Sequence, residues 1–343
     1  FPCSQHFKIP PIIFGTSALG NLYTILEDNI KLNIVSNCFR YMPTTPIVFD
    51  SAGKYGAGLA LEILGKCLQK LNINSENVII SNKLGWLRTP LTAAEPTFEK
   101  GVWHGLKNDA IQDISYDGIL KCWEQGNNLL GESYKPHMIS VHDPDEYIMD
   151  AEDDKERKKR FQDVIDAYKA LAELKGRSKN IAVGIGAKNW KIIMQICRNV
   201  DLDWIMFANS LTIYSHPQEL VDFISEMDKK NVTIINSAVF NAGFLIGGSY
   251  FNYKLIDRND KEYTNLFAWR ESFFKLCEEY NVNPSHACIR FGMSHPSIAS
   301  IALNTSNPAH VKKNIEEVQA DVPAEFFNIM KQKELINPDY SYV

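Results

Sequence analysis

Four side chains capable of acid–base chemistry stand at or just after three short apolar runs. Asp50 ends one run, Lys83 ends the next and His142 ends a third, while Tyr55 follows Asp50 by five residues. If these runs are strands of a barrel, their ends converge on one mouth. The four side chains are then expected to lie together, although they are far apart in the chain.

The chemistry expected of this set is proton transfer during oxidation of an alcohol. A tyrosine hydroxyl, with an ordinary pKa of about 10, is a weak base near neutral pH, and a nearby lysine ammonium would lower that pKa. Tyr55 and Lys83 supply this pair, Asp50 would hold the lysine, and His142 would orient the substrate oxygen by hydrogen bonding. Taken singly, each residue has an ordinary structural explanation, so the prediction depends on their joint placement.

Eight runs of strand length alternate with segments of helical period along the chain. They are rich in Ile and Val and mostly lack polar alternation, which is typical of strands buried on both faces. The runs cover residues 12–15, 47–50, 78–83, 138–142, 181–186, 204–209, 232–237 and 298–303. Between them, apolar stripes at three- and four-residue steps predict amphipathic helices around 60–71, 161–172 and 311–318.

This alternation allows an open doubly wound sheet or a closed (β/α)8 barrel. The segment from Gly184 to Asn189 has two of the three glycines of a dinucleotide fingerprint, with Asn189 at the third position. The barrel is therefore favoured. We expect a single barrel domain over residues 1–343, with a long substrate-side loop around 85–116 and a solvated helix opening in the charged run 150–160.

Composition narrows the class of protein. The 343 residues are 45% hydrophobic with a net charge of −5, which does not suggest a nucleic-acid binder. No apolar stretch reaches membrane-helix length, and residues 1–11 do not resemble a signal peptide. The seven cysteines are scattered without a C-x-x-C pair, which predicts a reduced, cytoplasmic protein.

Motifs across nearly the whole chain resemble the aldo-keto reductase superfamily, and within it the branch of L-fucose, D-threo-aldose and L-galactose 1-dehydrogenases. The Asp-x4-Tyr spacing with a later Lys and His is specific for the superfamily. The segments that carry the resemblance are 14–23 (FGTSALGNLY), 49–56 (FDSAGKYG), 115–118 (SYDG), 141–145 (VHDPD), 236–243 (NSAVFNAG) and 290–299 (RFGMSHPSIA).

The resemblance implies that Tyr55 transfers the proton, that Lys83 and Asp50 adjust the acidity of Tyr55, and that His142 orients the substrate. It also implies a nicotinamide cofactor extended across the barrel mouth without a Rossmann domain. The residues that it assigns to the cofactor are Phe240, Asn241, Gly243, Asn304, Thr305, Ser306, His310 and Asn314.

At three places the sequence differs from the family pattern, and these differences affect the residue roles inferred from the resemblance. Gly186 and Ala187 stand where many members have Ser-Asn to hold the carboxamide, so Asn189 is the candidate for that contact. Residues 209–212 (NSLT) replace a Gly-Arg-Tyr-Thr pattern of the branch. Asn304 and His310 occupy the family's lysine and arginine positions, and because a 2′-phosphate needs basic partners, NAD is expected over NADP.

The resulting prediction is an enzyme that moves a hydride from the anomeric carbon of an aldose such as L-fucose, L-galactose or D-arabinose to NAD(P), giving an aldonolactone. Tyr23, Trp86 and Trp103 are candidates for packing on the sugar, as is His142 for binding it. Alternatives are a reductase of other aldehydes, including pyridoxal-like ones, a non-catalytic cofactor-binding subunit, and a Schiff-base aldolase using Lys83. No metal, nucleic acid or membrane partner is expected, and the oligomeric state stays open between monomer and homodimer.

Overall fold

Eight parallel strands close into a barrel in the computed structural model, which describes residues 8–44, 46–178 and 180–343. Around the barrel the strands follow the order β1-β12-β9-β8-β7-β6-β3-β2, each hydrogen-bonded to the next. Their bounds are β1 Ile12–Gly15, β2 Ile47–Ala52, β3 Val78–Leu84, β6 Met138–His142, β7 Ala182–Ala187, β8 Trp204–Ala208, β9 Thr233–Ser237 and β12 Ile298–Asn304. The eight predicted runs therefore coincide with the eight barrel strands, and the barrel prediction is confirmed.

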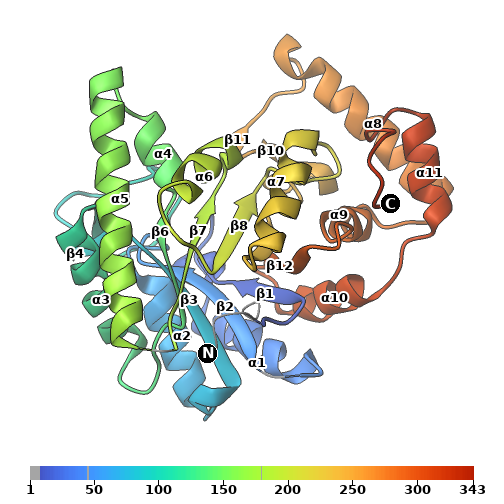
Figure 1. The fold of residues 1–343 in the computed structure, drawn as a ribbon. Helices are drawn as coiled ribbons and strands as arrows, with labels where there is room; N and C mark the ends of the chain where they lie inside the picture. Colours follow the sequence, from blue (N-terminus) through green and yellow to red (C-terminus); the bar gives the residue numbers. More distant parts are fainter. Residues whose placement is uncertain (1–7, 45, 179) are drawn as a thin grey trace.

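Helices surround this barrel and connect its strands (Figure 1). The predicted stripes lie on α2, α5 and α10, where most of their apolar residues are buried. The helices are α1 Asp28–Tyr41, α2 Leu59–Lys70, α3 Tyr116–Leu130, α4 Pro144–Met149, α5 Asp154–Arg177, α6 Trp190–Cys197, α7 Gln218–Lys229, α8 Thr264–Glu279, α9 Pro284–Gly292, α10 Pro308–Gln319 and α11 Ala324–Gln332. In the charged run, Asp153 caps α5 by accepting a hydrogen bond from the Glu156 amide.

The barrel interior is filled by side chains that alternate with those facing the helices. Ile13, Val48, Met138 and Trp204 belong to this inner cluster, with Trp204 fully buried. Trp204 lies beside Gly184 on the neighbouring strand, and a Cβ on Gly184 would overlap the indole ring. The glycine that resembles part of a dinucleotide fingerprint therefore serves packing of the barrel core.

The segment 85–116 is more ordered than the loop that we expected from its Pro and Gly content. It forms an antiparallel hairpin of β4 (Trp86–Pro90) and β5 (Asn108–Gln112), joined by residues 91–107. Arg88 anchors the hairpin to α2 by pairing with Glu62 at 3.0 Å and donating to the Ala57 carbonyl at 2.6 Å. Sequence periodicity misses the hairpin because its strands are short and only partly buried on the barrel rim.

A second hairpin follows β9, made of β10 (Tyr250–Phe251) and β11 (Lys254–Leu255). At its turn, Asn252 and Tyr253 both have positive φ, as a tight two-residue hairpin connection requires. Helices α8 and α11 then lie together on the side of the molecule opposite α5 (Figure 1).

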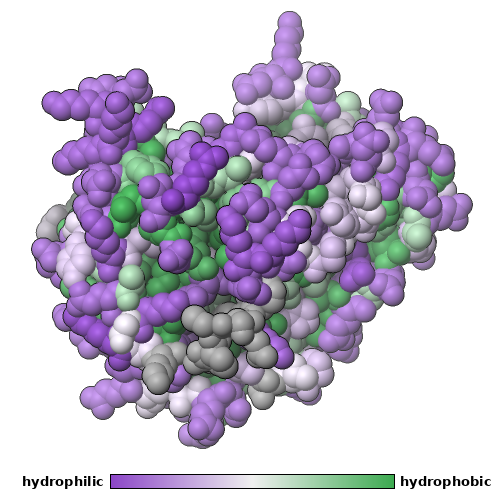
Figure 2. Space-filling model, in the orientation of Figure 1, coloured by the Kyte–Doolittle hydropathy of each residue, from purple (hydrophilic) through white to green (hydrophobic). Residues whose placement is uncertain are grey.

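Hydrophilic side chains cover most of the periphery on the face drawn in Figure 2, and hydrophobic atoms show mainly between them. Within the described residues, no helix is both long and apolar enough to cross a membrane. Six cysteines are free thiols, five of them buried; Cys3 and the rest of segment 1–7 lie outside the described residues.

Candidate active site

Neighbouring strands bring the four predicted acid–base residues to one end of the barrel. Asp50 lies on β2, Lys83 on β3 and His142 at the end of β6, and these three strands are adjacent in the barrel. Tyr55 lies in the turn after β2, where Gly56 has a φ of 61° and its backbone packs against Gly20. A side chain at position 56 would strike the Gly20 backbone, so glycine allows the turn that places Tyr55.

The geometry of this set matches the expected chemistry in most respects. The Lys83 ammonium forms a buried ion pair with the Asp50 carboxylate, which also accepts a hydrogen bond from the Ser81 hydroxyl at 3.0 Å. The Lys83 Nζ lies 4.8 Å from the centre of the Tyr55 ring. The rings of Tyr55 and His142 meet edge to face, with centroids 5.4 Å apart.

The expected effect of lysine on the tyrosine is corrected by the structure. Burial raises the pKa of Tyr55 well above its ordinary value, and the negative charges of Asp50 and Asp143 raise it further. Because Lys83 is paired with Asp50, its charge is largely balanced. Lys188 is the cation that acts to lower the Tyr55 pKa, without overcoming burial. Tyr55 is therefore a neutral phenol near neutral pH.

His142 is also neutral in this environment. Burial lowers its pKa well below the ordinary value; Asp143 acts in the opposite direction but does not outweigh burial. The His142 Nε2 lies 3.6 Å from a carboxylate oxygen of Asp143. A neutral imidazole at this position can hold a substrate oxygen by a hydrogen bond without contributing a charge.

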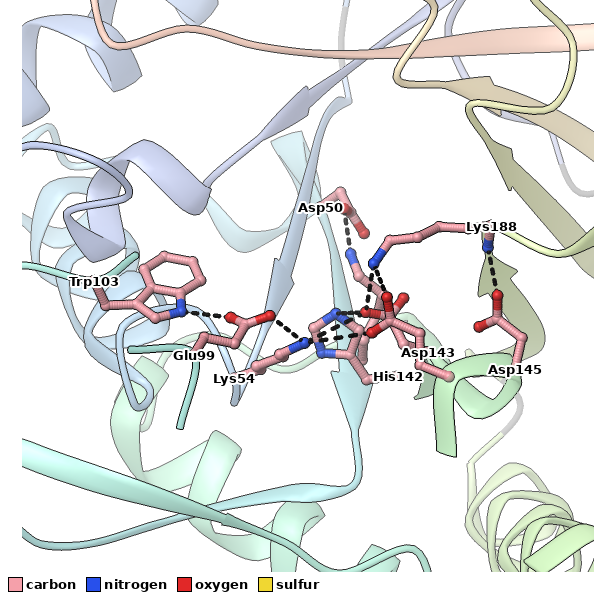
Figure 3. Close-up of polar contacts among 10 residues, drawn as sticks. Asp50, Lys54, Glu99, Trp103, His142, Asp143, Asp145 and Lys188 are labelled. Carbon is pink, nitrogen blue, oxygen red and sulfur yellow. Dashed lines mark hydrogen bonds and ion pairs between the residues drawn. The ribbon is translucent and has the colours of Figure 1, made fainter. Parts of the chain in front are cut away.

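A second group of charged side chains surrounds the first, and the sequence reasoning missed it. We call it the lysine–carboxylate cluster, and it consists of Lys54, Glu99, Asp143, Glu146 and Lys188. Figure 3 shows Lys54 and Lys188 reaching Asp143 from opposite sides. Two of its members were detectable, because Lys54 directly precedes Tyr55 and Asp143 directly follows His142 in the sequence.

Ion pairs and hydrogen bonds with the surrounding loops hold the lysine–carboxylate cluster in place. Lys54 Nζ lies 2.7 Å from Glu99, whose other oxygen accepts a hydrogen bond from the Trp103 indole at 2.6 Å (Figure 3). On the other side, the Asp145 carboxylate accepts hydrogen bonds from the Lys188 and Asn189 amides at 3.0 and 2.7 Å. Asp145 thereby fixes the loop after β7 that carries Lys188.

One cavity of about 790 Å³ joins both groups to the residues expected to hold a cofactor. Tyr55, Lys83 and His142 line it, and so do Lys313 and Asn314 of α10. The predicted cofactor residues found in its lining are Phe240, Gly243, Asn304, Thr305, Ser306, His310 and Asn314. A cavity of this volume, lined by amides, hydroxyls and an imidazole, suits a large polar ligand such as a dinucleotide.

Two predicted cofactor contacts are not brought to this cavity. The Asn189 side chain caps α6 by accepting hydrogen bonds from the Lys191 and Ile192 amides, so its amide is not directed at a carboxamide. Asn241 is buried, and its amide donates to Asn252 across the loop at 2.8 Å. Asn189 thus caps a helix and Asn241 ties two loop side chains together, and neither lines the cavity.

Of the three aromatic residues predicted to pack on the sugar, two line the cavity and one does not. Tyr23 lines the cavity and stacks on Tyr250 of the second hairpin, with ring centroids 5.3 Å apart. Trp103 also lines it, 5.9 Å from the Tyr55 ring. Trp86 instead packs behind Lys54, whose Nζ lies 5.2 Å from the indole centre, so Trp86 supports the wall and does not form it.

No group of three or more His, Cys, Asp or Glu side chains in the described ranges is placed to hold a metal ion. The sequence His142-Asp143-Pro144-Asp145 accordingly distributes its side chains over separate tasks. His142 and Asp143 face the cavity, whereas Asp145 accepts hydrogen bonds from the backbone of the next loop.

Comparison with known proteins places this fold and site in a family. The model of the aldo/keto reductase family matches residues 11–335, so the chain belongs to the aldo/keto reductase family. Proteins of this family are oxidoreductases that use nicotinamide cofactors.

Two similar proteins carry more specific names. The chain is 25% identical over 338 residues to a pyridoxal 4-dehydrogenase from Microbacterium luteolum, covering 94% of this chain and 93% of that protein. It is 23% identical over 348 residues to a D-threo-aldose 1-dehydrogenase from a Pseudomonas species, covering 96% and 95%.

Solved structures show the same fold. A holo-form aldo-keto reductase from Bacillus halodurans superposes with a TM-score of 0.66 at 18% identity, covering 95% of this chain and 92% of that one. A glycerol dehydrogenase from Gluconobacter oxydans also gives a TM-score of 0.66, at 16% identity, covering 97% and 95%.

Proposed function

We propose that this protein is an NAD-dependent aldose 1-dehydrogenase, which oxidises the anomeric carbon of a cyclic aldose to give an aldonolactone. The observation that carries the proposal is that Tyr55, His142 and the Lys83–Asp50 pair line the same cavity as most of the residues expected to hold the cofactor. We assign the catalytic role to Tyr55 and orientation of the substrate oxygen to His142.

The reaction divides between proton and hydride. The nicotinamide, when bound, supplies the hydride acceptor. In the proposed mechanism the C1 hydroxyl of the sugar hydrogen-bonds to Tyr55 and to the neutral His142, and the deprotonated fraction of Tyr55, a phenolate, takes the hydroxyl proton and becomes a phenol. The Lys83–Asp50 pair packs beneath the Tyr55 ring and fixes the phenol. The loop 85–116 is proposed as the substrate-side wall, through Glu99 and Trp103.

NAD is proposed over NADP on grounds of charge. Asn304 and His310 are the cavity residues at the positions where the family has basic ones. The two lysines of α10 each have an acidic partner one turn along: Lys312 lies 3.5 Å from Glu316 and Lys313 lies 3.6 Å from Glu317. A 2′-phosphate would therefore find no arginine fork and two partly neutralised ammonium groups.

A pyridoxal-type aldehyde is the second candidate, because a relative at 25% identity is named a pyridoxal 4-dehydrogenase. Both aldoses and pyridoxal can close to cyclic hemiacetals, so the same proton and hydride transfers would yield a lactone from either. The aldolase alternative is disfavoured, since Lys83 is buried in an ion pair with Asp50 and a protonated amine is not a nucleophile.

The test is absorbance at 340 nm with NAD and with NADP, over L-fucose, L-galactose, D-arabinose and pyridoxal. We expect turnover of an aldose with NAD, and its loss in Tyr55→Phe while NAD binding is retained. Turnover of pyridoxal alone would replace the aldose assignment. Binding of NAD without turnover of any substrate would indicate a non-catalytic cofactor-binding protein, and a borohydride-trapped adduct at Lys83 would indicate an aldolase.

A further inference from the structure

The carboxylate of Asp143 faces the cavity without the hydrogen bonds that a buried carboxylate normally has. One of its oxygens lies 3.5 Å from Lys54 Nζ, 3.6 Å from Lys188 Nζ and 3.6 Å from His142 Nε2. These are ion-pair distances, longer than good hydrogen bonds. An ionised carboxylate can accept about four hydrogen bonds, so Asp143 retains most of its capacity for a ligand.

The backbone holds Asp143 in this position at the expense of an ordinary structural role. Asp143 immediately precedes α4, where an aspartate usually caps the helix, yet its side chain makes no capping hydrogen bond. Its φ is 44°, in the left-handed region that aspartate, like asparagine, adopts more readily than most residues other than glycine. The Asp143 carboxylate therefore faces the cavity and does not cap the amides of α4.

Asp143 stays ionised in this surrounding. Burial acts to raise its pKa, but the ammonium groups of Lys188 and Lys54 outweigh burial and hold the pKa below its ordinary value. The same carboxylate helps to raise the pKa of Lys54 against the effect of burial. The charged donors Lys54 and Lys188 and the charged acceptor Asp143 thus lie together in one small part of the cavity wall.

This mixture of groups determines which ligand chemistry fits. A hydroxyl both donates and accepts, so it can donate to Asp143 while accepting from Lys54 or Lys188. In the cluster as a whole, the two lysines face three carboxylates, those of Glu99, Asp143 and Glu146. The cluster therefore offers no excess positive charge to a phosphorylated or carboxylated substrate, and an apolar aldehyde would give the Asp143 carboxylate no hydrogen-bond donor.

We propose that Asp143 is a specificity-determining residue that accepts a hydrogen bond from the hydroxyl on the carbon next to the reacting carbon, so that the substrate is an uncharged aldose bearing a C2 hydroxyl. The inference rests on the proposed aldose dehydrogenase function. Asp143 lies directly beside His142, which orients the oxygen on C1, so the adjacent hydroxyl is the one within reach. Lys54 and Lys188 complete the contact as donors to sugar oxygens.

Two pairs of sugars isolate the C2 hydroxyl. L-fucose is compared with 2-deoxy-L-fucose, and D-arabinose with 2-deoxy-D-ribose, which differs from it only by loss of that hydroxyl. In the wild-type protein we expect kcat/KM to be about 10- to 100-fold higher for the hydroxylated sugar, because one hydrogen bond to a charged group is at stake. In Asp143→Asn this ratio is expected to fall to within a few fold of unity.

The ratio is informative because any disturbance of His142 or Tyr55 affects both sugars of a pair equally. Asparagine has the size of aspartate and tolerates positive φ, so Asp143→Asn keeps the backbone. Glu146→Gln is the matched variant: it removes a carboxylate that contacts the same two lysines, at 3.9 Å from Lys54 Nζ and in an ion pair with Lys188. We expect it to preserve the preference for the hydroxylated sugar.

The inference is overturned if the wild-type protein oxidises both sugars of each pair equally, a result that needs no variant. It is also overturned if Asp143→Asn retains the full preference, or if Glu146→Gln loses it to the same degree. In each of these cases the aldose dehydrogenase function stands, because a sugar is still oxidised. If no aldose is oxidised by the wild-type protein, the proposed function fails, and the role of Asp143 fails with it.

Discussion

Lys83 and Asp50 form a buried ion pair between adjacent strands β3 and β2, with side chains only 6% and 8% exposed. The pair lies below the Tyr55 ring, so the lysine contacts the aromatic face while its charge is balanced by the aspartate. This arrangement explains how a lysine can lie so close to Tyr55 while the pKa of the phenol remains raised.

Removing one partner of this pair is expected to cost more stability than removing both. Lys83→Met leaves the Asp50 carboxylate buried without its cation, and we expect a loss of about 3–5 kcal/mol in the free energy of unfolding. The double variant Lys83→Met/Asp50→Asn should recover much of that loss but no activity. Chemical denaturation of the two single variants and the double variant measures this coupling; additive losses would contradict it.

Oxidation is expected to accelerate with pH. Because the pKa of Tyr55 is raised, the phenol stays protonated through the neutral range, and its basic form increases as pH rises. We expect kcat/KM for oxidation to rise about tenfold per pH unit between about pH 7 and pH 9. The pKa of His142 is lowered, so its protonation adds no change in this window. A flat profile from pH 6 to 9 would require a different base.

Cofactor preference is expected to respond to one substitution in the cavity lining. His310→Arg supplies a planar fork that matches a phosphate, so kcat/KM with NADP should rise about tenfold relative to NAD. Initial rates with both cofactors at one sugar concentration give the ratio. Lys312→Gln, outside the cavity lining and paired with Glu316, is the control and should leave the ratio unchanged. A wild-type preference for NADP would contradict the proposal.

The barrel interior is expected to reject even one added methyl group at Gly184. Alanine there would overlap the Trp204 indole, which is fully buried, so Gly184→Ala should destabilise the fold by about 1–3 kcal/mol. Gly176→Ala is the matched control, because nothing lies near a Cβ on this glycine of α5, and alanine favours a helix by up to about 1 kcal/mol. Thermal unfolding should therefore shift in opposite directions for the two variants.

The sequence predicted the strands and the four acid–base residues because these depend on local patterns. Runs of Ile and Val indicate buried strands, and Asp50, Lys83 and His142 lie at or near the ends of such runs. The β4–β5 hairpin was missed because its residues are only partly buried. Its short strands show no regular spacing of apolar residues by which a strand is detected in sequence. Asn189 was placed at the cofactor because an asparagine that caps a helix and one that binds a ligand look alike in sequence.

The sequence by itself thus determined the eight strands and which of them carry Asp50, Lys83 and His142, since burial on both faces leaves a local trace; it favoured the closed barrel over an open sheet only through the incomplete dinucleotide fingerprint and the family resemblance. Only the tertiary structure decided the electrostatics of the site. The neutral state of Tyr55 depends on burial and on Asp143, and the cluster around Asp143 joins Lys54, Glu99 and Lys188 from loops that follow three different strands. Such charges interact through space over a few ångströms, so no pattern along the chain records them.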